Sequence, residues 1–178
     1  MRHEWISRPA VPHPRPPLLQ AVLDFVRAAR TIPGVLRIAL IGSLTTDKPV
    51  PKDADVLVSI KNDIDLGLLA RYGRRLQGTA QRINLGADIF LANEKGRYIG
   101  RICRFRECHR RRACRAQHCG GVDHLNDDLH VVTLPAELIA VPPVELWPRV
   151  VRRRRLPTDV EKLLLAALER DAGMNTKT

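Results

Sequence analysis

Two aspartates separated by one residue, Asp53 and Asp55, carry the clearest chemical signal in this sequence of 178 residues. They open an apolar run that continues to Ile60 and is rich in the β-branched residues typical of strands. Side chains alternate along a strand, so both carboxylates point to the same face. Like charges this close together cost free energy unless a cation lies between them. Paired carboxylates of this kind are typical of Mg²⁺ sites, where substrate phosphates complete the coordination.

A glycine and a hydroxyl residue come shortly before this pair. The apolar run 35–41 leads directly into Gly42 and Ser43, and a polar loop with two prolines then leads to Asp53. Glycine allows a phosphate to approach the backbone closely, and the serine hydroxyl and nearby amides can donate hydrogen bonds to it. Lys48 and Lys52 lie in the same loop and could reach the same phosphates. The predicted nucleotide-binding residues are therefore Gly42, Ser43, Lys48 and Lys52.

A third carboxylate, Asp88, lies inside the apolar segment 83–92. A charged residue in an apolar strand normally needs a polar partner or a function. One interpretation is that Asp88 completes a metal site; the other is that it lies on an edge strand and faces water. The first pair also has a second interpretation, in which Asp53 and Asp55 only cap a turn.

The order of these elements resembles the nucleotidyltransferase superfamily that includes DNA polymerase β, and in particular its minimal, stand-alone members. The shared pattern is a hydrophobic strand, Gly-Ser, a loop, Asp-x-Asp within a strand and a carboxylate on a later strand. It covers residues 35 to 91, about a third of the chain. Lys52 departs from the pattern, since many members carry a small polar residue just before the Asp-x-Asp pair.

The resemblance implies an α/β (α+β) fold, with a mixed-sheet core and flanking helices. It also implies that Asp53, Asp55 and Asp88 bind two Mg²⁺ ions and that Asp88 can act as general base. The expected reaction moves a nucleoside monophosphate from an NTP to a hydroxyl of an RNA, a protein or a small molecule. The sequence has no large helical substrate domain after the core, so a second copy of the chain or a partner protein could complete the acceptor site.

All four cysteines fall in one basic segment, residues 103 to 119. Clustered cysteines in a cytosolic chain favour zinc over disulfides, and a structural zinc site needs four thiolate or imidazole ligands. The simplest ligand set is Cys103, Cys108, Cys114 and Cys119, with His109 or His118 as substitutes and His124 or His130 as further alternatives. The competing interpretation is a set of reduced cysteines in a basic loop. The arginines between them are expected to grip RNA or polyphosphate through phosphate contacts; they are Arg104, Arg106, Arg110, Arg111, Arg112 and Arg115.

The sequence is strongly basic, with a net charge of +11. A field of that sign attracts polyanions such as nucleic acid or nucleotides, although a solubilising surface with local arginine runs would give the same charge. Asp127 and Asp128 form a second acidic pair, for which we expect ion pairs with the basic segment. The sequence contains no apolar run of transmembrane length and no apolar signal core, so we expect a cytoplasmic protein without membrane contact.

The remaining pattern predicts the elements that position these groups. Residues 1–17 are proline-rich and predict a flexible arm, followed by a nucleotidyltransferase core over 18–95 with helices at about 18–32 and 62–79. Residues 96–134 form the Cys/Arg-rich insertion and a closing strand at 129–134. Residues 135–178 are predicted to be helical: short turns broken by proline up to Pro148, then a final helix that begins at the capping box of residues 158–161. The whole chain is expected to form one domain.

A non-enzymatic interpretation also fits these observations. The chain could be a zinc-stabilised nucleic-acid-binding module that retains the fold without the chemistry, or an antitoxin-like partner that sequesters another protein. Binding of RNA that survives loss of Asp53, without nucleotide turnover, would favour the first of these.

Overall fold

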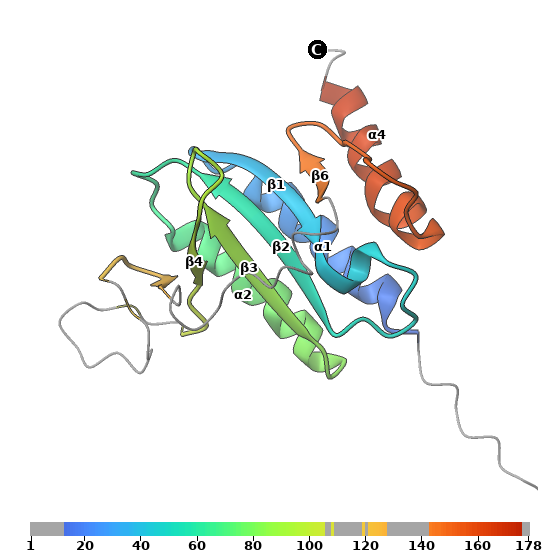
Figure 1. The fold of residues 1–178 in the computed structure, drawn as a ribbon, viewed down its shortest axis with the longest axis horizontal. Helices are drawn as coiled ribbons and strands as arrows, with labels where there is room; N and C mark the ends of the chain where they lie inside the picture. The colour runs from blue at the N-terminus through green and yellow to red at the C-terminus, as the bar shows by residue number, and fades with distance from the viewer. Residues whose placement is uncertain (1–12, 106–107, 109–118, 120, 128–142, 176–178) are drawn as a thin grey trace, which may run out of the picture.

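The computed structural model describes residues 13–105, 108, 119, 121–127 and 143–175. It is an α+β fold with a six-stranded mixed sheet and three helices (Figure 1). The strands are β1 (Val35–Ile41), β2 (Asp53–Ile60), β3 (Gly86–Ala92), β4 (Tyr98–Ile102), β5 (Leu125–Asn126) and β6 (Val144–Trp147), and the helices are α1 (Arg15–Ala29), α2 (Gly67–Arg82) and α4 (Ala166–Asn175). Two shorter helical segments are η1 (Gly42–Thr45) and η2 (Val160–Leu165). Among the described residues, no helix combines the length and the apolar character needed to span a bilayer.

The sheet has the strand order β5-β4-β3-β2-β1-β6. Strands β2 and β3 are parallel, with α2 as the crossover between them, and every other neighbouring pair is antiparallel. The predicted apolar runs at 35–41 and 53–60 thus form adjacent central strands. The predicted segment 83–92 begins as a strand three residues later, at Gly86.

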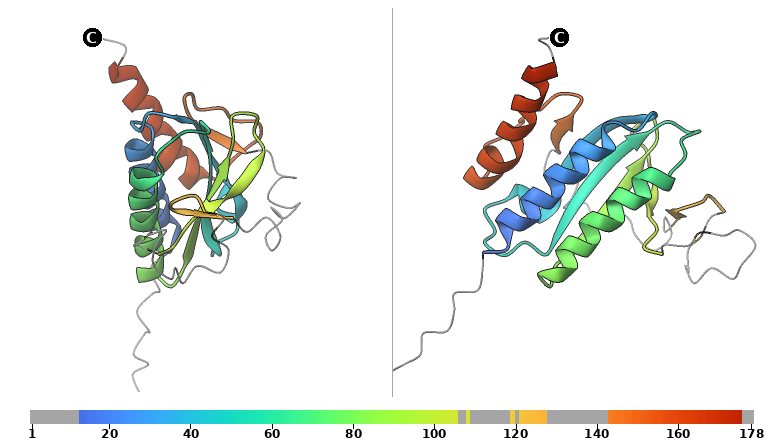
Figure 2. Two further views of the ribbon diagram at one scale, coloured as in Figure 1. Left: turned by 90° about the vertical axis from the view of Figure 1, so that its left-hand side faces the viewer. Right: turned by 180° about the vertical axis from the view of Figure 1, so that it is seen from behind.

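Helices α1 and α2 lie together on one face of the sheet (Figure 2). Alternate residues of the central strands, including Val56 of β2 and Ile89 of β3, are fully buried in the core with residues of α1 and α2. Helix α2 packs closely on β3 because residue 73 is glycine: a Cβ there would lie 3.1 Å from Ile89 Cδ1. The strand residues between these core positions, Asp55 and Asp88 among them, therefore face the opposite side, which we call the open face.

The first helix begins earlier than the sequence predicted. Pro16 and Pro17 occupy the first turn of α1, where their missing N–H groups cost nothing, and the helix includes Arg15. The last three residues of the predicted arm, 15–17, therefore belong to α1, while residues 1–12 lie outside the described part of the chain. At the other helix, α2 begins at Gly67 rather than at residue 62, and Asp65 Oδ1 accepts the Gly67 N–H at 2.8 Å.

The prediction of helical turns at 135–148 is wrong for its last residues. Val144–Trp147 forms strand β6, which pairs with β1 and ends the sheet. Val144 and Leu146 are buried, whereas Glu145 is only partly buried and accepts Arg37 Nη2 at 3.4 Å. This is the period-two pattern of a strand. The predicted strand at 129–134 lies outside the described residues.

The final helical segment also differs in its first turn. Asp159, not Thr158, caps it, with Oδ1 accepting the Val160 N–H at 2.9 Å. Glu161 does not complete a capping box but binds Arg152, with Nε 2.9 Å from Oε2. The segment continues as η2 and α4 and lies beside α1, to which Asp171 is joined by ion pairs with Arg27 and Arg30 (Figure 1).

Candidate active site

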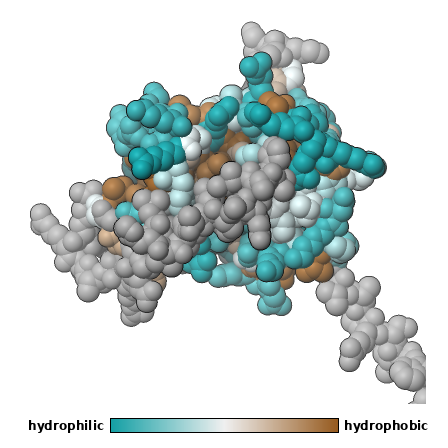
Figure 3. All heavy atoms as spheres, viewed as in Figure 1, coloured by the Kyte–Doolittle hydropathy of each residue, from teal (hydrophilic) through white to brown (hydrophobic). Residues whose placement is uncertain are grey.

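The carboxylates predicted from the sequence lie on neighbouring central strands. Asp53 and Asp55 open β2 on the open face of the sheet, and Asp88 in β3 stands directly opposite Asp55 in the parallel register. The turn that carries Gly42 and Ser43 follows β1, and Ile41 at the end of β1 pairs with Asp55. All these residues therefore meet at one end of the sheet. Figure 3 views the molecule with the open face of the sheet toward the reader. Most of the described surface around the rim of this view is hydrophilic.

Asp53 is fitted against the backbone of β3. A Cβ at position 86, its partner in the register, would collide with Asp53 Oδ1. Glycine at position 86 therefore leaves the room that this carboxylate occupies. No sequence signal had marked Gly86 as part of the site.

Asp55 is the most buried of the three carboxylates, with 9 % of its surface exposed. Burial, and after it the charges of Asp53 and Asp88, raise its pKa to about 7, and the charge of Arg101 opposes this shift. The site therefore carries more negative charge than its protein surroundings neutralise. An added cation would relieve this imbalance.

Asp88 is bound by two arginines. Arg101 Nη1 lies 3.2 Å and Arg104 Nη2 lies 3.5 Å from Asp88 Oδ1. Arg101 also stacks over Phe90, with its guanidinium carbon 6.0 Å from the ring centroid. Arg104 was expected to grip nucleic acid and Arg101 was not singled out. In the structure both arginines reach the carboxylate site, and the nucleic-acid role of Arg104 stays a prediction.

The Gly-Ser turn is held by its own side chains. Gly42 has a φ of 73°, a conformation that favours glycine. Ser43 Oγ accepts the Lys52 N–H at 3.1 Å and lies 3.4 Å from the carbonyl oxygen of Asp53, so it closes the loop between its two ends. Thr45 Oγ1 donates to the Gly42 carbonyl at 2.7 Å. This bracing fixes the backbone amides that were predicted to meet phosphate.

Two arginines from distant parts of the chain fasten the same loop. Arg15 is 4 % exposed, and all five of its N–H groups have acceptors. Two of these acceptors are the Asp159 carboxylate oxygens, at 2.6 and 3.1 Å, and the other three are the carbonyl oxygens of Leu44, Thr46 and Lys48, at 2.9 to 3.0 Å. Arg154 Nη2 donates to the Thr45 carbonyl and to Thr45 Oγ1. Sequence reasoning missed both arginines: Arg15 was assigned to the arm, and Arg154 was not among the predicted site residues.

The two predicted phosphate-binding lysines take part only through their main chains. The Lys48 carbonyl accepts from Arg15, and the Lys52 N–H donates to Ser43. Both residues are exposed, so their ammonium groups remain accessible to a ligand.

The predicted zinc segment lies largely outside the described residues, which include Cys103, Cys108 and Cys119 but not Cys114, His109 or His118. Arg106, Arg110, Arg111, Arg112 and Arg115 lie outside them too. His124 lies close to the described cysteines: its N–H donates to Cys108 Sγ at 3.2 Å and its carbonyl accepts the Cys103 N–H at 2.8 Å. Its Nδ1 is buried without a hydrogen-bond partner, and burial, with the charge of Arg74, lowers the pKa of the imidazole.

As arranged in the described residues, no group of three or more histidine, cysteine, aspartate or glutamate side chains is placed to hold a metal ion. The donor chemistry of Asp53 and Asp55 nevertheless fits a divalent cation, because one of these carboxylates is buried beside like charge. Asp88 is neutralised by arginine and would have to release it to become a ligand. No family model, curated protein or solved structure matches the chain.

Proposed function

We propose that this protein is a Mg²⁺-dependent nucleotidyltransferase that moves a nucleoside monophosphate from an NTP to an acceptor hydroxyl. One observation carries the proposal: the Asp53–Asp55 pair, with Asp88 in register beside it, lies at the strand end that the Gly42–Ser43 turn also occupies. This is the arrangement that the resemblance to the nucleotidyltransferase superfamily implies. The acceptor is an RNA, a protein or a small molecule.

In this proposal the turn and the carboxylates have separate roles. The amides of the braced loop and the ammonium groups of Lys48 and Lys52 bind the triphosphate, and Asp53 and Asp55 hold Mg²⁺. Bound Mg²⁺ supplies charge neutralisation on the phosphates and on the departing pyrophosphate. Binding of the cation stabilises the ionised form of Asp55, whose pKa is otherwise near neutrality.

The chemical step is an in-line displacement at the α-phosphorus. The acceptor oxygen forms a bond to that phosphorus, the bond to the α,β-bridging oxygen breaks, and pyrophosphate leaves with the electron pair. Asp88 takes the proton of the acceptor hydroxyl. Arg101 and Arg104, which hold Asp88 in its present position, would transfer to phosphate oxygens as the nucleotide arrives.

Calorimetric titration of each NTP, with and without Mg²⁺, tests the proposal. Binding is expected only with Mg²⁺ in the wild type and is expected to be lost in Asp53→Asn/Asp55→Asn. Asp47→Asn is a matched control, since Asp47 is an exposed aspartate of the same loop. Absence of binding to metal-replete wild type at millimolar NTP would overturn the proposal. If binding occurs, candidate acceptors are screened for release of pyrophosphate.

The ion pairs of Asp88 favour a second candidate. Asp88 is already paired with Arg101 and Arg104. Such pairing is expected in a protein that keeps this fold but binds no metal at the site. The chain would then be a non-catalytic nucleic-acid-binding module or an antitoxin-like partner of another protein. RNA binding that is unchanged in Asp53→Asn, with no nucleotide binding, would support the module. Co-purification of a stoichiometric partner would support the antitoxin-like role.

A structural zinc site is compatible with both proposed functions. The proximity of His124 to Cys108, and its unpartnered Nδ1, agree with a ligand set in which a histidine joins the cysteines. Metal analysis of purified protein tests this assignment: we expect one zinc per chain, and reduced zinc content in Cys108→Ser. Zinc-free protein that is stably folded would exclude a structural zinc site.

A further inference from the structure

Helix α2 is the most one-sidedly charged element of the described fold. It contains four arginines and no acidic residue. Several arginines outside α2 form ion pairs with carboxylates of the same chain, among them Arg15, Arg27 and Arg152. Three of the four α2 arginines are not neutralised in this way by a described residue.

Three of the α2 arginines share one stripe of the helix. Arg71, Arg75 and Arg82 are four and seven residues apart, which places them one and two turns apart along the helix, at rises of about 6 and 10 Å. All three are exposed, and none forms an ion pair with a described residue. The fourth, Arg74, points elsewhere and donates to the Phe105 carbonyl at 3.2 Å. The stripe therefore presents three cations to solvent along one line of the helix.

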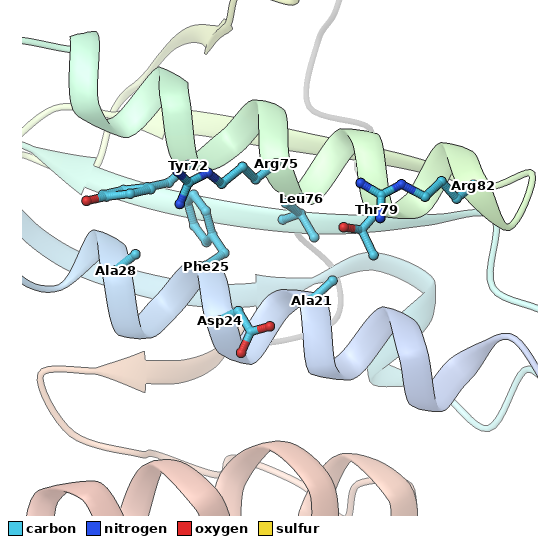
Figure 4. Close-up of a pocket in the computed structure, with 9 residues that line it drawn as sticks. All are labelled: Ala21, Asp24, Phe25, Ala28, Tyr72, Arg75, Leu76, Thr79 and Arg82. Carbon is cyan, nitrogen blue, oxygen red and sulfur yellow. The ribbon is translucent and has the colours of Figure 1, made fainter.

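A hollow of about 460 Å³ adjoins this stripe, between α1 and α2 (Figure 4). Tyr72, Arg75, Thr79 and Arg82 form its α2 wall, and the Tyr72 ring lies beside the Arg75 guanidinium, whose carbon is 5.7 Å from the ring centroid. On the α1 wall Asp24 also lines the hollow, and its carboxylate accepts from Gln20 at 2.9 Å. The hollow is therefore lined on the α2 side by two arginines and an aromatic ring, and on the α1 side by one carboxylate that is hydrogen-bonded to Gln20.

The burial of the apolar residues at the floor of the hollow indicates which class of ligand could bind there. Phe25 is 3 % exposed and Leu76 is 2 % exposed, so the apolar side chains are already buried by the two helices. A docking helix or a lipid surface would gain little by covering them, because apolar affinity scales with the area removed from water. Recognition here must come from charge, hydrogen bonds and the aromatic ring. A chain of phosphates that carries flat bases supplies all three.

We propose that the outer face of α2, together with this hollow, binds single-stranded nucleic acid. Arg71, Arg75 and Arg82 contact successive stretches of the phosphate backbone, and a base enters the hollow beside Tyr72. This surface lies on the helical side of the sheet, opposite the open face that carries Asp53 and Asp55 (Figure 2). It is therefore a site separate from the carboxylates, and it does not depend on their chemistry.

Fluorescence anisotropy with a labelled oligouridylate, measured over a series of salt concentrations, tests the proposal. The test variant is Arg75→Glu/Arg82→Glu. The control is Arg97→Glu/Arg155→Glu, which changes the net charge equally at two exposed arginines without ion pairs to described residues. The α2 variant is expected to bind at least tenfold more weakly than the control. Arg75→Gln/Arg82→Gln is expected to reduce the slope of log K against log salt by about 1.4, as expected for two lost phosphate contacts to a single strand.

Tyr72→Leu separates base from phosphate recognition. It is expected to weaken oligouridylate binding while leaving inorganic polyphosphate binding unchanged. Equal losses in the α2 and control variants would show that net charge alone drives binding and would overturn the proposal, as would no oligouridylate binding by the wild type. Circular dichroism verifies the fold of each variant, and the glutamine pair supplies the decisive comparison if the glutamate pair does not fold.

Discussion

Arg15 and Asp159 lie 144 residues apart in the chain and form a two-point ion pair, with Nε–Oδ2 at 2.6 Å and Nη2–Oδ1 at 3.1 Å. Burial alone would raise the pKa of Asp159, but its hydrogen bond and charge interaction with Arg15 bring the pKa below its usual value. The same guanidinium holds three carbonyls of the loop after Gly42–Ser43. The pair thus connects the first and last helical segments to the candidate nucleotide loop.

Removal of the Arg15 side chain should therefore be costly. Arg15→Ala leaves a partly buried carboxylate and three carbonyls without their donor, and we expect a loss of about 3 kcal/mol in the free energy of unfolding. The matched control is Arg27→Ala, which removes a more exposed pair with Asp171 and should cost at most about 1 kcal/mol. Urea denaturation of both variants checks this. Equal losses in the two variants would mean that burial does not make the Arg15 ion pair more important for stability than the exposed Arg27 pair.

The buried carboxylate Asp55 predicts an unusual pH dependence. Its folded-state pKa of about 7 lies above the unfolded value near 3.8, so the folded protein binds more protons between these values. Without divalent metal, stability should therefore fall as pH rises from 5 to 8, by about 2 to 4 kcal/mol for this group. Asp55→Asn should remove most of this fall and be more stable than wild type at pH 8. Denaturation in EDTA at both pH values measures the effect, and the same slope in both proteins would contradict the assignment.

Gly86 gives a test of the Asp53 position. Gly86→Ala places a methyl group where Asp53 Oδ1 lies, so the carboxylate must move. We expect Mg²⁺-dependent NTP affinity to fall at least tenfold in calorimetric titrations. Gly78→Ala is the control, because a Cβ there meets no atom within 4 Å, and it should stabilise α2 by about 0.5 to 1 kcal/mol. Unchanged affinity in Gly86→Ala would show that the position of Asp53 is unimportant for binding.

Ser43 should order the loop more than it stabilises the whole fold. Ser43→Ala removes the acceptor of the Lys52 N–H, at a cost of about 1 kcal/mol. Hydrogen exchange is expected to accelerate at the amides of residues 43–52 and to remain unchanged in β3. Ser59→Ala is the control: Ser59 lies on the open face of β2, its hydroxyl forms no hydrogen bond with a described residue, and the substitution should alter neither region. Uniform acceleration in both variants would point to global destabilisation instead.

The central strands and the carboxylates were predictable because their signals are local. An apolar run before Gly42 and another after Asp55 define two strands, and alternation alone places Asp53 and Asp55 on one face. The position of Asp88 opposite Asp55 needed only the strand-helix-strand order of the intervening chain. These features depend on short local patterns and on the order of consecutive elements.

The features that were missed depend on distant partners or on misleading neighbours. Nothing local to Arg15 shows that it is buried, since its carboxylate comes from the other end of the described chain. Strand β6 was taken for helical turns because prolines flank it, although the alternation of Val144 and Leu146 with Glu145 and Trp147 is a strand signal. The pairing of Asp88 with Arg101 likewise needed the antiparallel turn from β3 to β4.

The loop after Gly42 and Ser43 is held by residues that are synthesised much later than the loop itself. A nascent chain that has reached residue 143 already contains Gly42, Ser43 and the three carboxylates, yet it has neither β6 to pair with β1 nor Asp159 to orient Arg15. Until those residues leave the ribosome, one edge of β1 is unpaired and the candidate nucleotide loop is not yet fastened. The growing chain therefore carries the three carboxylates well before the loop beside them is fastened, and the candidate site is complete only when β6 and η2 have docked.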